Sequence, residues 1–405
     1  MKHFKKWIAV ILSVACLTAF GVVMTSCGKN TGAVKIGVIR EDDSSGEASA
    51  WEAYLNGVGK EMNITFDFTT TASSSDETSA IRTYASKGYK AILLFSDDDR
   101  VSAVNEAANN KIYVAIPTGH PTDEQYEQIK DNPYYLGSVA PVNDTEYQAG
   151  YDMAKFFVEQ KGQKNFTIFG GATLYGAEMH VHRLAGMLVY LCETAGTSYD
   201  GATTRDALIG KLAGKSLDPS KFVSNTYRIT GYMDGFAFDD AFSTKLTRSL
   251  ETGGTCILSV GAGDTVAKIA YGISQASGGK ITGVVSGGVD AITADYAACF
   301  DLGYSYDCGK FASAMGPGLI LVQSALEGKK IVNAEGHAPK VGMNYWVATG
   351  KDELNSMLAS DNATTGFCYN ANVLNHFIGN TYEEFLKICN ADYAAAVAFH
   401  NEYNK

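Results

Sequence analysis

Short apolar runs alternate with helical segments from residue 34 onward, and this alternation constrains the fold more than any other feature. The first four runs are rich in β-branched residues, and the segments between them have helical length and pattern. The runs lie at 34–39, 64–68, 89–95 and 111–117, and the helical segments at 48–62, 77–87 and 101–109. Strands separated by such helices need crossover connections, which favour a parallel sheet with helices on both faces. The sequence therefore predicts an α/β fold.

The same alternation starts again in the second half of the chain. Strands are expected at 165–169, 225–229, 256–260 and 281–285, and helices at 144–160, 182–195, 238–251 and 265–275. Because each half has too few units to close a barrel, we expect two Rossmann-like lobes with parallel sheets. Residues 206–223 are expected to form an inserted loop, and helices are expected near the C-terminus at 382–389 and 392–402.

The N-terminus has the features of an export signal. Lys2, Lys5 and Lys6 precede an uncharged apolar stretch at 7–23, as in leaders that enter the secretory machinery. The following Met-Thr-Ser-Cys-Gly resembles a bacterial lipobox, in which the cysteine, here Cys27, receives the lipid and becomes the new N-terminus. We therefore expect a signal peptide over 1–26 and a lipid anchor at the extracellular face of the cell membrane. An ordinary signal peptide and an uncleaved anchor helix are the alternatives.

Composition and missing motifs argue against several functions. The formal net charge of −11 is unsuited to nucleic-acid binding. The sequence contains no G-x-S-x-G or H-E-x-x-H motif, so we expect no enzyme activity. The six cysteines beyond residue 27 form no C-x-x-C pair, and His180 and His182 lack an evident third ligand. We therefore expect neither a metal nor a cofactor, and mostly buried thiols.

Five features, in order along the chain, resemble the type I periplasmic-binding-protein fold in its sugar-binding branch. They are Trp51 and Gly57 after the first strand, the run YKAILLFSDDD followed by KIYVAIP, the segment YLGSVAPVNDTEYQAG at 135–150, the Arg-x-x-Gly motif at 183–186, and Gly263-Asp264 with Gly288-Val289-Asp290. The resemblance covers residues 34–331 and implies hinge crossovers between two lobes. It places lobe 1 at 34–140, lobe 2 at 141–304, a return to lobe 1 over about 305–335, and a last crossover with a C-terminal extension at 336–405.

The resemblance also implies a ligand site at the carboxyl ends of the strands, where open α/β sheets bind their ligands. A sugar has apolar faces and many hydroxyls, so an aromatic plate and charged hydrogen-bonding groups suit it. The expected ligand-binding residues are Trp51, Asp97, Arg183, Asp264, Asp290 and Tyr232. Structural roles stay open: helix core for Trp51, helix capping for Asp264 and for at least one of 97–99, and a surface ion pair for Arg183.

These features favour a monomeric solute-binding lipoprotein of an ABC importer. Such a protein would capture a small sugar or related polyol between two closing lobes and deliver it to the permease subunits. A nucleoside-binding lipoprotein of the same fold is an alternative, because Trp51 would serve a base equally well. A sugar-sensing subunit for a membrane kinase is another. An extracellular hydrolase is the least favoured, since the motifs it would need are missing.

Overall fold

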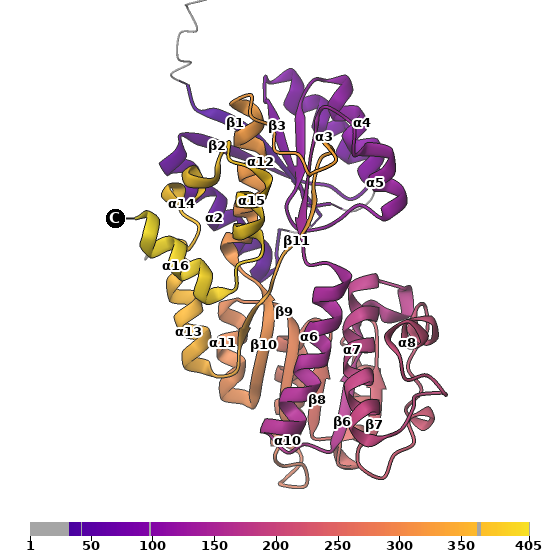
Figure 1. Ribbon diagram of the computed structural model, residues 1–405. Helices are drawn as coiled ribbons and strands as arrows, with labels where there is room; N and C mark the ends of the chain where they lie inside the picture. The colour runs from indigo at the N-terminus through magenta and orange to yellow at the C-terminus, as the bar shows by residue number, and fades with distance from the viewer. Residues whose placement is uncertain (1–31, 42, 97–98, 363–365, 405) are drawn as a thin grey trace, which may run out of the picture.

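The computed structural model describes residues 32–41, 43–96, 99–362 and 366–404, which form two lobes, each built on a six-stranded sheet (Figure 1). The expected leader, with Cys27, lies outside these residues. Within the described part of the chain, no helix is long and apolar enough to span a bilayer. The two-lobed α/β architecture expected from the sequence is confirmed.

The first lobe has a sheet that is parallel throughout, in the order β11-β5-β4-β3-β1-β2. Its strands are β1 (Val34–Arg40), β2 (Ile64–Thr70), β3 (Ala91–Leu94), β4 (Tyr113–Ile116), β5 (Tyr135–Ala140) and β11 (Lys340–Gly342). Its helices are α2 (Gly46–Met62), α3 (Ser74–Ser86), α4 (Arg100–Asn109), α5 (Asp123–Ile129) and α12 (Gly316–Leu326).

The second lobe has the order β12-β10-β9-β8-β6-β7, and only β12 is antiparallel to its neighbour. Its strands are β6 (Asn165–Phe169), β7 (Arg228–Met233), β8 (Cys256–Ser259), β9 (Val285–Ala291), β10 (Tyr304–Lys310) and β12 (Trp346–Ala348). Its helices are α6 (Asn143–Lys155), which continues as a π-helical turn over Phe156–Gln160, α7 (Glu178–Ala195), α8 (Arg205–Leu212), α9 (Asp240–Glu251), α10 (Gly263–Ala276) and α11 (Ala294–Cys299).

Helix α2 shows how local sequence positions residues between the lobes. Its first turn is capped by Ser45, whose Oγ accepts a hydrogen bond from the backbone N–H of Ala48 at 3.1 Å. The helix ends at Asn63, which has a left-handed φ of 55°. Tyr54 on the helix is fully buried in the lobe core. The first turns of the helix thereby lie at the carboxyl end of β1, next to the second lobe.

Three crossovers connect the sheets, and they correct part of the expected division. The chain passes from β5 to α6, from β10 to α12, and from β11 to β12. Because β10 pairs with β9, the return to the first lobe comes after residue 310, not near 305. The strand expected at 281–285 instead spans Val285–Ala291, and the expected inserted loop at 206–223 contains most of helix α8.

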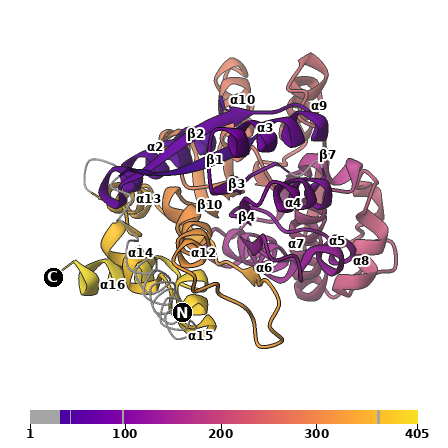
Figure 2. The ribbon, with the colours of Figure 1, turned by 90° about the horizontal axis from the view of Figure 1, so that it is seen from above.

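The C-terminal extension contacts both lobes. It comprises α13 (Lys351–Ser360), α14 (Ala371–Phe377), α15 (Tyr382–Cys389) and α16 (Tyr393–Tyr403). Helix α13 lies against α11 of the second lobe, whereas α14 and α15 lie against α12 of the first (Figures 1 and 2). Trp346 of β12 stacks on Phe311 with ring centroids 3.8 Å apart and also meets Tyr393 of α16. The C-terminal extension and the crossovers therefore share one buried aromatic cluster.

The cysteines are structural in this fold. All six within the described residues are buried free thiols, as the sequence predicted, and they are Cys192, Cys256, Cys299, Cys308, Cys368 and Cys389. Cys299 and Cys308, which are near neighbours in sequence, form no disulfide.

Asp361 gives the extension a pH-dependent attachment. Its carboxylate accepts hydrogen bonds from the backbone N–H of Ser313 at 3.0 Å, from the Ser313 hydroxyl, and from the Cys368 N–H at 3.3 Å. Burial raises the pKa of Asp361 to about 7. A carboxyl whose pKa is higher in the folded state than in the unfolded state stabilises the fold most at pH values below its unfolded pKa. This stabilisation is lost as the pH rises through 7.

We predict that the unfolding free energy of the wild type falls by about 2–3 kcal/mol between about pH 5 and pH 8 relative to Asp361→Asn. The asparagine cannot ionise, so the variant lacks this pH-dependent contribution. Its absolute stability at any one pH does not enter the comparison. Urea unfolding of both proteins at the two pH values measures the difference. Parallel pH profiles for the two proteins would contradict the assignment.

Candidate functional site

The two lobes meet where helix α2, which follows β1, lies close to the carboxyl end of β10, and we refer to this junction as the cleft. Glu47, in the first turn of α2, forms an ion pair with Lys310, the last residue of β10, at 3.0 Å. A side chain at Gly46 would meet the Asp295 carboxylate of the second lobe, with its Cβ 2.7 Å from that oxygen. The lobes are therefore already in contact on the side of α2 and α11.

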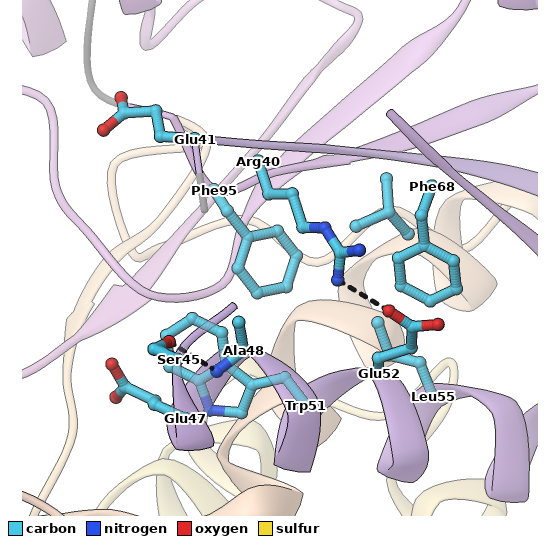
Figure 3. A pocket seen from close by; sticks show the side chains of 11 residues that line it. Arg40, Glu41, Ser45, Glu47, Ala48, Trp51, Glu52, Leu55, Phe68 and Phe95 are labelled. Carbon is cyan, nitrogen blue, oxygen red and sulfur yellow. Dashed lines mark hydrogen bonds and ion pairs between the residues drawn. The ribbon is translucent and has the colours of Figure 1, made fainter. Parts of the chain in front are cut away.

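A cavity of about 170 Å³ opens on the first-lobe side of this cleft. It lies between the carboxyl ends of β1 and β3, the strand β2, and the first two turns of α2 (Figure 3). Three aromatic rings contribute to its wall: Trp51, Phe68 and Phe95. The rings of Trp51 and Phe95 lie 5.3 Å apart with a 40° tilt. The cavity also has polar walls, lined by Arg40, Glu41, Ser45, Glu47 and Glu52.

The charged groups of this cavity are paired. Arg40 Nη1 lies 2.7 Å from Glu52 Oε2, and its guanidinium carbon lies 5.1 Å from the Phe68 ring centroid. Lys310 lies with its Nζ 5.0 Å from the Trp51 ring centroid while it pairs with Glu47. Burial raises the pKa of Glu47, although the Lys310 ammonium acts in the opposite direction.

Two expected first-lobe residues have different outcomes. Trp51 is half-buried and lines the cavity. Its contact with a ligand stays a prediction. Asp97 lies outside the described residues. Its neighbour Asp99 caps α4, where it accepts hydrogen bonds from the Ser102 N–H at 3.0 Å and the Ser102 hydroxyl. Capping by one residue of 97–99 was among the open alternatives.

Arg183 does not offer its guanidinium to the cleft, which corrects the expectation of a ligand contact. The residue is 2% exposed. Its Nε donates to Glu146 at 2.6 Å, and its Nη2 donates to the Tyr345 hydroxyl at 2.7 Å. Its Nη1 donates to the carbonyls of Val260 at 2.6 Å and Val289 at 2.9 Å. All three guanidinium nitrogens are therefore used inside the protein.

The Arg183 network joins a crossover segment to the second lobe. Glu146 lies on α6, and Tyr345 lies in the third crossover between β11 and β12. Tyr345 also donates to the second Glu146 oxygen at 2.7 Å. Val260 and Val289 lie at the carboxyl ends of β8 and β9. The guanidinium thus holds α6 and the third crossover against the carboxyl ends of these two strands.

The other expected second-lobe residues are engaged with their own lobe. Asp290 Oδ2 accepts from the Ala262 N–H at 2.9 Å and the Tyr296 hydroxyl at 2.7 Å. Asp264 pairs with Lys268, one turn along α10, at 2.8 Å. Asp290 is half-buried near Glu47 across the cleft, so it remains a candidate ligand residue.

Tyr232 is held within the second lobe, beside the end of β6. Its hydroxyl is buried next to Gly170, where an added Cβ would come within 2.0 Å of the oxygen, and burial raises its pKa. Nothing in these contacts brings Tyr232 to the Trp51 cavity.

Sequence reasoning missed three residues that the structure brings to the cleft, namely Glu47, Phe95 and Lys310. Lys310 ends β10, in the segment from about residue 305 that was expected to return to the first lobe. His180 Nδ1 accepts the Ala172 N–H at 2.8 Å, so its proton lies on Nε2. Burial lowers its pKa to about 3, which keeps it neutral. Among the residues that the structure describes, no group of three His, Cys, Asp or Glu side chains could hold a metal.

The two lobes, each built on a six-stranded sheet, define a class of fold. Solved structures that are similar to this chain identify that fold. A periplasmic solute-binding protein of an ABC transporter from Actinobacillus succinogenes 130z, with bound D-allose, is 14% identical over 80% of this chain and 99% of its own, with a TM-score of 0.57. An ABC transporter solute-binding protein from Bacillus halodurans C-125, with bound myo-inositol, is 15% identical over 81% and 98%, with a TM-score of 0.53.

A galactofuranose-binding protein is also similar, at 13% identity over 80% of this chain and 98% of its own, with a TM-score of 0.53. No family model and no curated sequence match the chain. At these identities the likeness establishes the fold. The chain has the type I periplasmic-binding-protein fold that its sequence motifs indicated.

We predict that Arg183→Ala lowers the unfolding free energy by about 3–5 kcal/mol, because it leaves Glu146 buried without its cation. Arg183→Lys should recover little, since an ammonium cannot reproduce the fixed fork of donors. Chemical unfolding followed by circular dichroism measures both. The matched control is Arg205→Ala, which breaks the exposed ion pair with Asp144 and should cost at most about 1 kcal/mol. Equal losses of unfolding free energy in the two alanine variants would contradict this structural role of Arg183.

Proposed function

We propose that the protein is a lipid-anchored extracellular solute-binding protein that captures a sugar-like ligand between its lobes and delivers it to an ABC permease. It would act by binding alone, with no chemical step. The observation that carries the proposal is the aromatic cavity at Trp51, which lies at the carboxyl ends of first-lobe strands, where open α/β sheets generally bind ligands. The similar solved structures, which include proteins with bound D-allose and myo-inositol, support a ligand of this class.

The cavity suits a pyranose or a cyclic polyol. The Trp51 and Phe95 rings present apolar faces to the C–H groups of a sugar ring. Glu47 and Asp290 supply acceptors for hydroxyl groups from opposite sides of the cleft. A ligand that contacts both lobes favours the closed arrangement, because only that arrangement provides both sets of contacts.

We predict that Trp51→Ala weakens ligand binding at least about tenfold, because it removes the larger of two stacking surfaces. A thermal-shift screen of sugars, polyols and nucleosides identifies the ligand, and calorimetric titration then measures its affinity. Trp346→Phe serves as the control, since Trp346 is buried in the hinge-side core and should affect stability without affecting affinity. Unchanged affinity in Trp51→Ala, or a ligand found only among nucleosides, would contradict the proposal.

The lipid anchor rests on the sequence around Cys27. The motif Met-Thr-Ser-Cys-Gly follows an apolar stretch of signal-peptide length, and the folded lobes begin at β1 only a few residues later. A lipid at Cys27 would therefore hold the lobes close to the membrane that contains the permease. A sensor subunit for a membrane kinase would use the same anchor, and neighbouring permease and ATPase genes would favour the importer.

We predict that Cys27→Ala leaves the precursor unprocessed or releases the protein from the membrane, because the thioether acceptor is lost. Membrane fractionation and the electrophoretic mobility of the precursor test this in a bacterial host. Cys16→Ala, within the apolar stretch, is the matched control and should mature normally. Normal processing and membrane retention of Cys27→Ala would rule out the anchor.

A further inference from the structure

The centre of the cleft holds more carboxylates than cations. Glu47 of the first lobe lies near both Lys310 and Asp290 of the second. The nearby Arg183 guanidinium is neutralised by the buried Glu146 at 2.6 Å. Lys310 can balance only one of the two cleft carboxylates. One negative charge is therefore left where the lobes meet.

Asp290 forms no ion pair with a cationic side chain of the described residues. Its hydrogen bonds come from the neutral N–H of Ala262 and the phenol of Tyr296. It lies on β9, beside Lys310 on β10, because Asp290 pairs with Gly309 in the parallel register. In this register Lys310 lies opposite Ala291, and its ammonium pairs with Glu47, which leaves Asp290 without that charge.

Aromatic faces at the site already hold positive groups of the protein itself. The Lys310 ammonium lies over Trp51, and the Arg40 guanidinium lies over Phe68. Aromatic faces attract cations through their negative quadrupole, most strongly in the case of tryptophan. An indole next to a carboxylate, as Trp51 is next to Glu47, is an arrangement that accommodates an ammonium group.

We propose that the ligand of this cleft is a sugar-sized molecule that carries one ammonium group, as an amino sugar does, and that this group lies against Trp51 between Glu47 and Asp290. The inference rests on the proposed function and narrows its ligand class. The ligand supplies the missing positive charge and connects carboxylates of both lobes. Its sugar ring occupies the aromatic cavity, while Lys310 stays paired with one of the two carboxylates.

The pairing of the protein's own cations supports this choice over a neutral sugar. A neutral sugar needs donors for its oxygens as well as acceptors for its hydroxyls. The guanidiniums of Arg40 and Arg183 already donate to Glu52 and to internal acceptors. Glu41 also contributes to the lining of the first-lobe cavity. The cleft is therefore richer in acceptors than in available donors, which suits a donor-rich ligand.

Matched sugar pairs test the inference. Calorimetric titrations compare D-glucosamine with D-glucose, D-galactosamine with D-galactose, and D-mannosamine with D-mannose, at about pH 6 so that the amines are protonated. We expect one amine to bind at least about tenfold more tightly than its neutral partner in about 50 mM salt, with a smaller difference in about 500 mM salt. The N-acetyl form of that sugar, which is neutral, should lose the advantage.

Two variants locate the charge. Glu47→Gln should reduce the ratio of the amine's affinity to that of its neutral partner to less than about threefold, because only the ammonium uses the charge. Asp264→Asn is the matched control, since Lys268 already neutralises that carboxylate, and it should keep the preference. Tight binding of a neutral sugar without a preference for its amine would overturn this inference and leave the proposed function standing. Failure of every pair to bind would overturn both.

Discussion

The Arg183 guanidinium is the interaction on which the second-lobe side of the cleft depends. It lies beneath the cleft and joins the carboxyl ends of β8 and β9 to Glu146 of α6 and to Tyr345 in the third crossover. A buried cation is tolerated only with close partners of opposite charge and satisfied donors, and this network provides both. Because this network fixes the residues beneath the cleft, the cleft itself can hold a carboxylate that no cation of the protein neutralises.

Much of the fold follows from local sequence. The apolar strands of both lobes are short runs of buried residues bounded by polar turns, and nearly all of them lie close to their expected positions. The elements that were misplaced have weaker signals: α8 is a short helix without a clear apolar face, and β9 has a serine and two glycines directly after its first residue. The segment of β10 was assigned to the wrong lobe because its pairing with β9 is a tertiary contact, which the local sequence of the strand does not predict.

The candidate site was less predictable than the fold, for a physical reason. Motif similarity pointed to Trp51 and Arg183 as ligand-binding residues, but the role of a polar residue depends on its partners, which come from distant parts of the chain. Arg183 is satisfied by residues 37 to 162 positions away. The Glu47–Lys310 pair joins the first helix of one lobe to a late strand of the other. No local sequence pattern predicts such a pair. An aromatic residue that follows a strand can instead be recognised by its distance along the sequence from that strand.

The C-terminal extension has a consequence for how the molecule loses its structure. Trp346, Phe311 and Tyr393 place one aromatic cluster across the hinge side of both lobes, and Tyr54 of α2 donates to the Tyr369 carbonyl of the extension at 2.8 Å. Neither lobe can melt without exposing part of this shared core. The two lobes should therefore behave as one cooperative unit on heating, with a single calorimetric transition where separate lobes would give two.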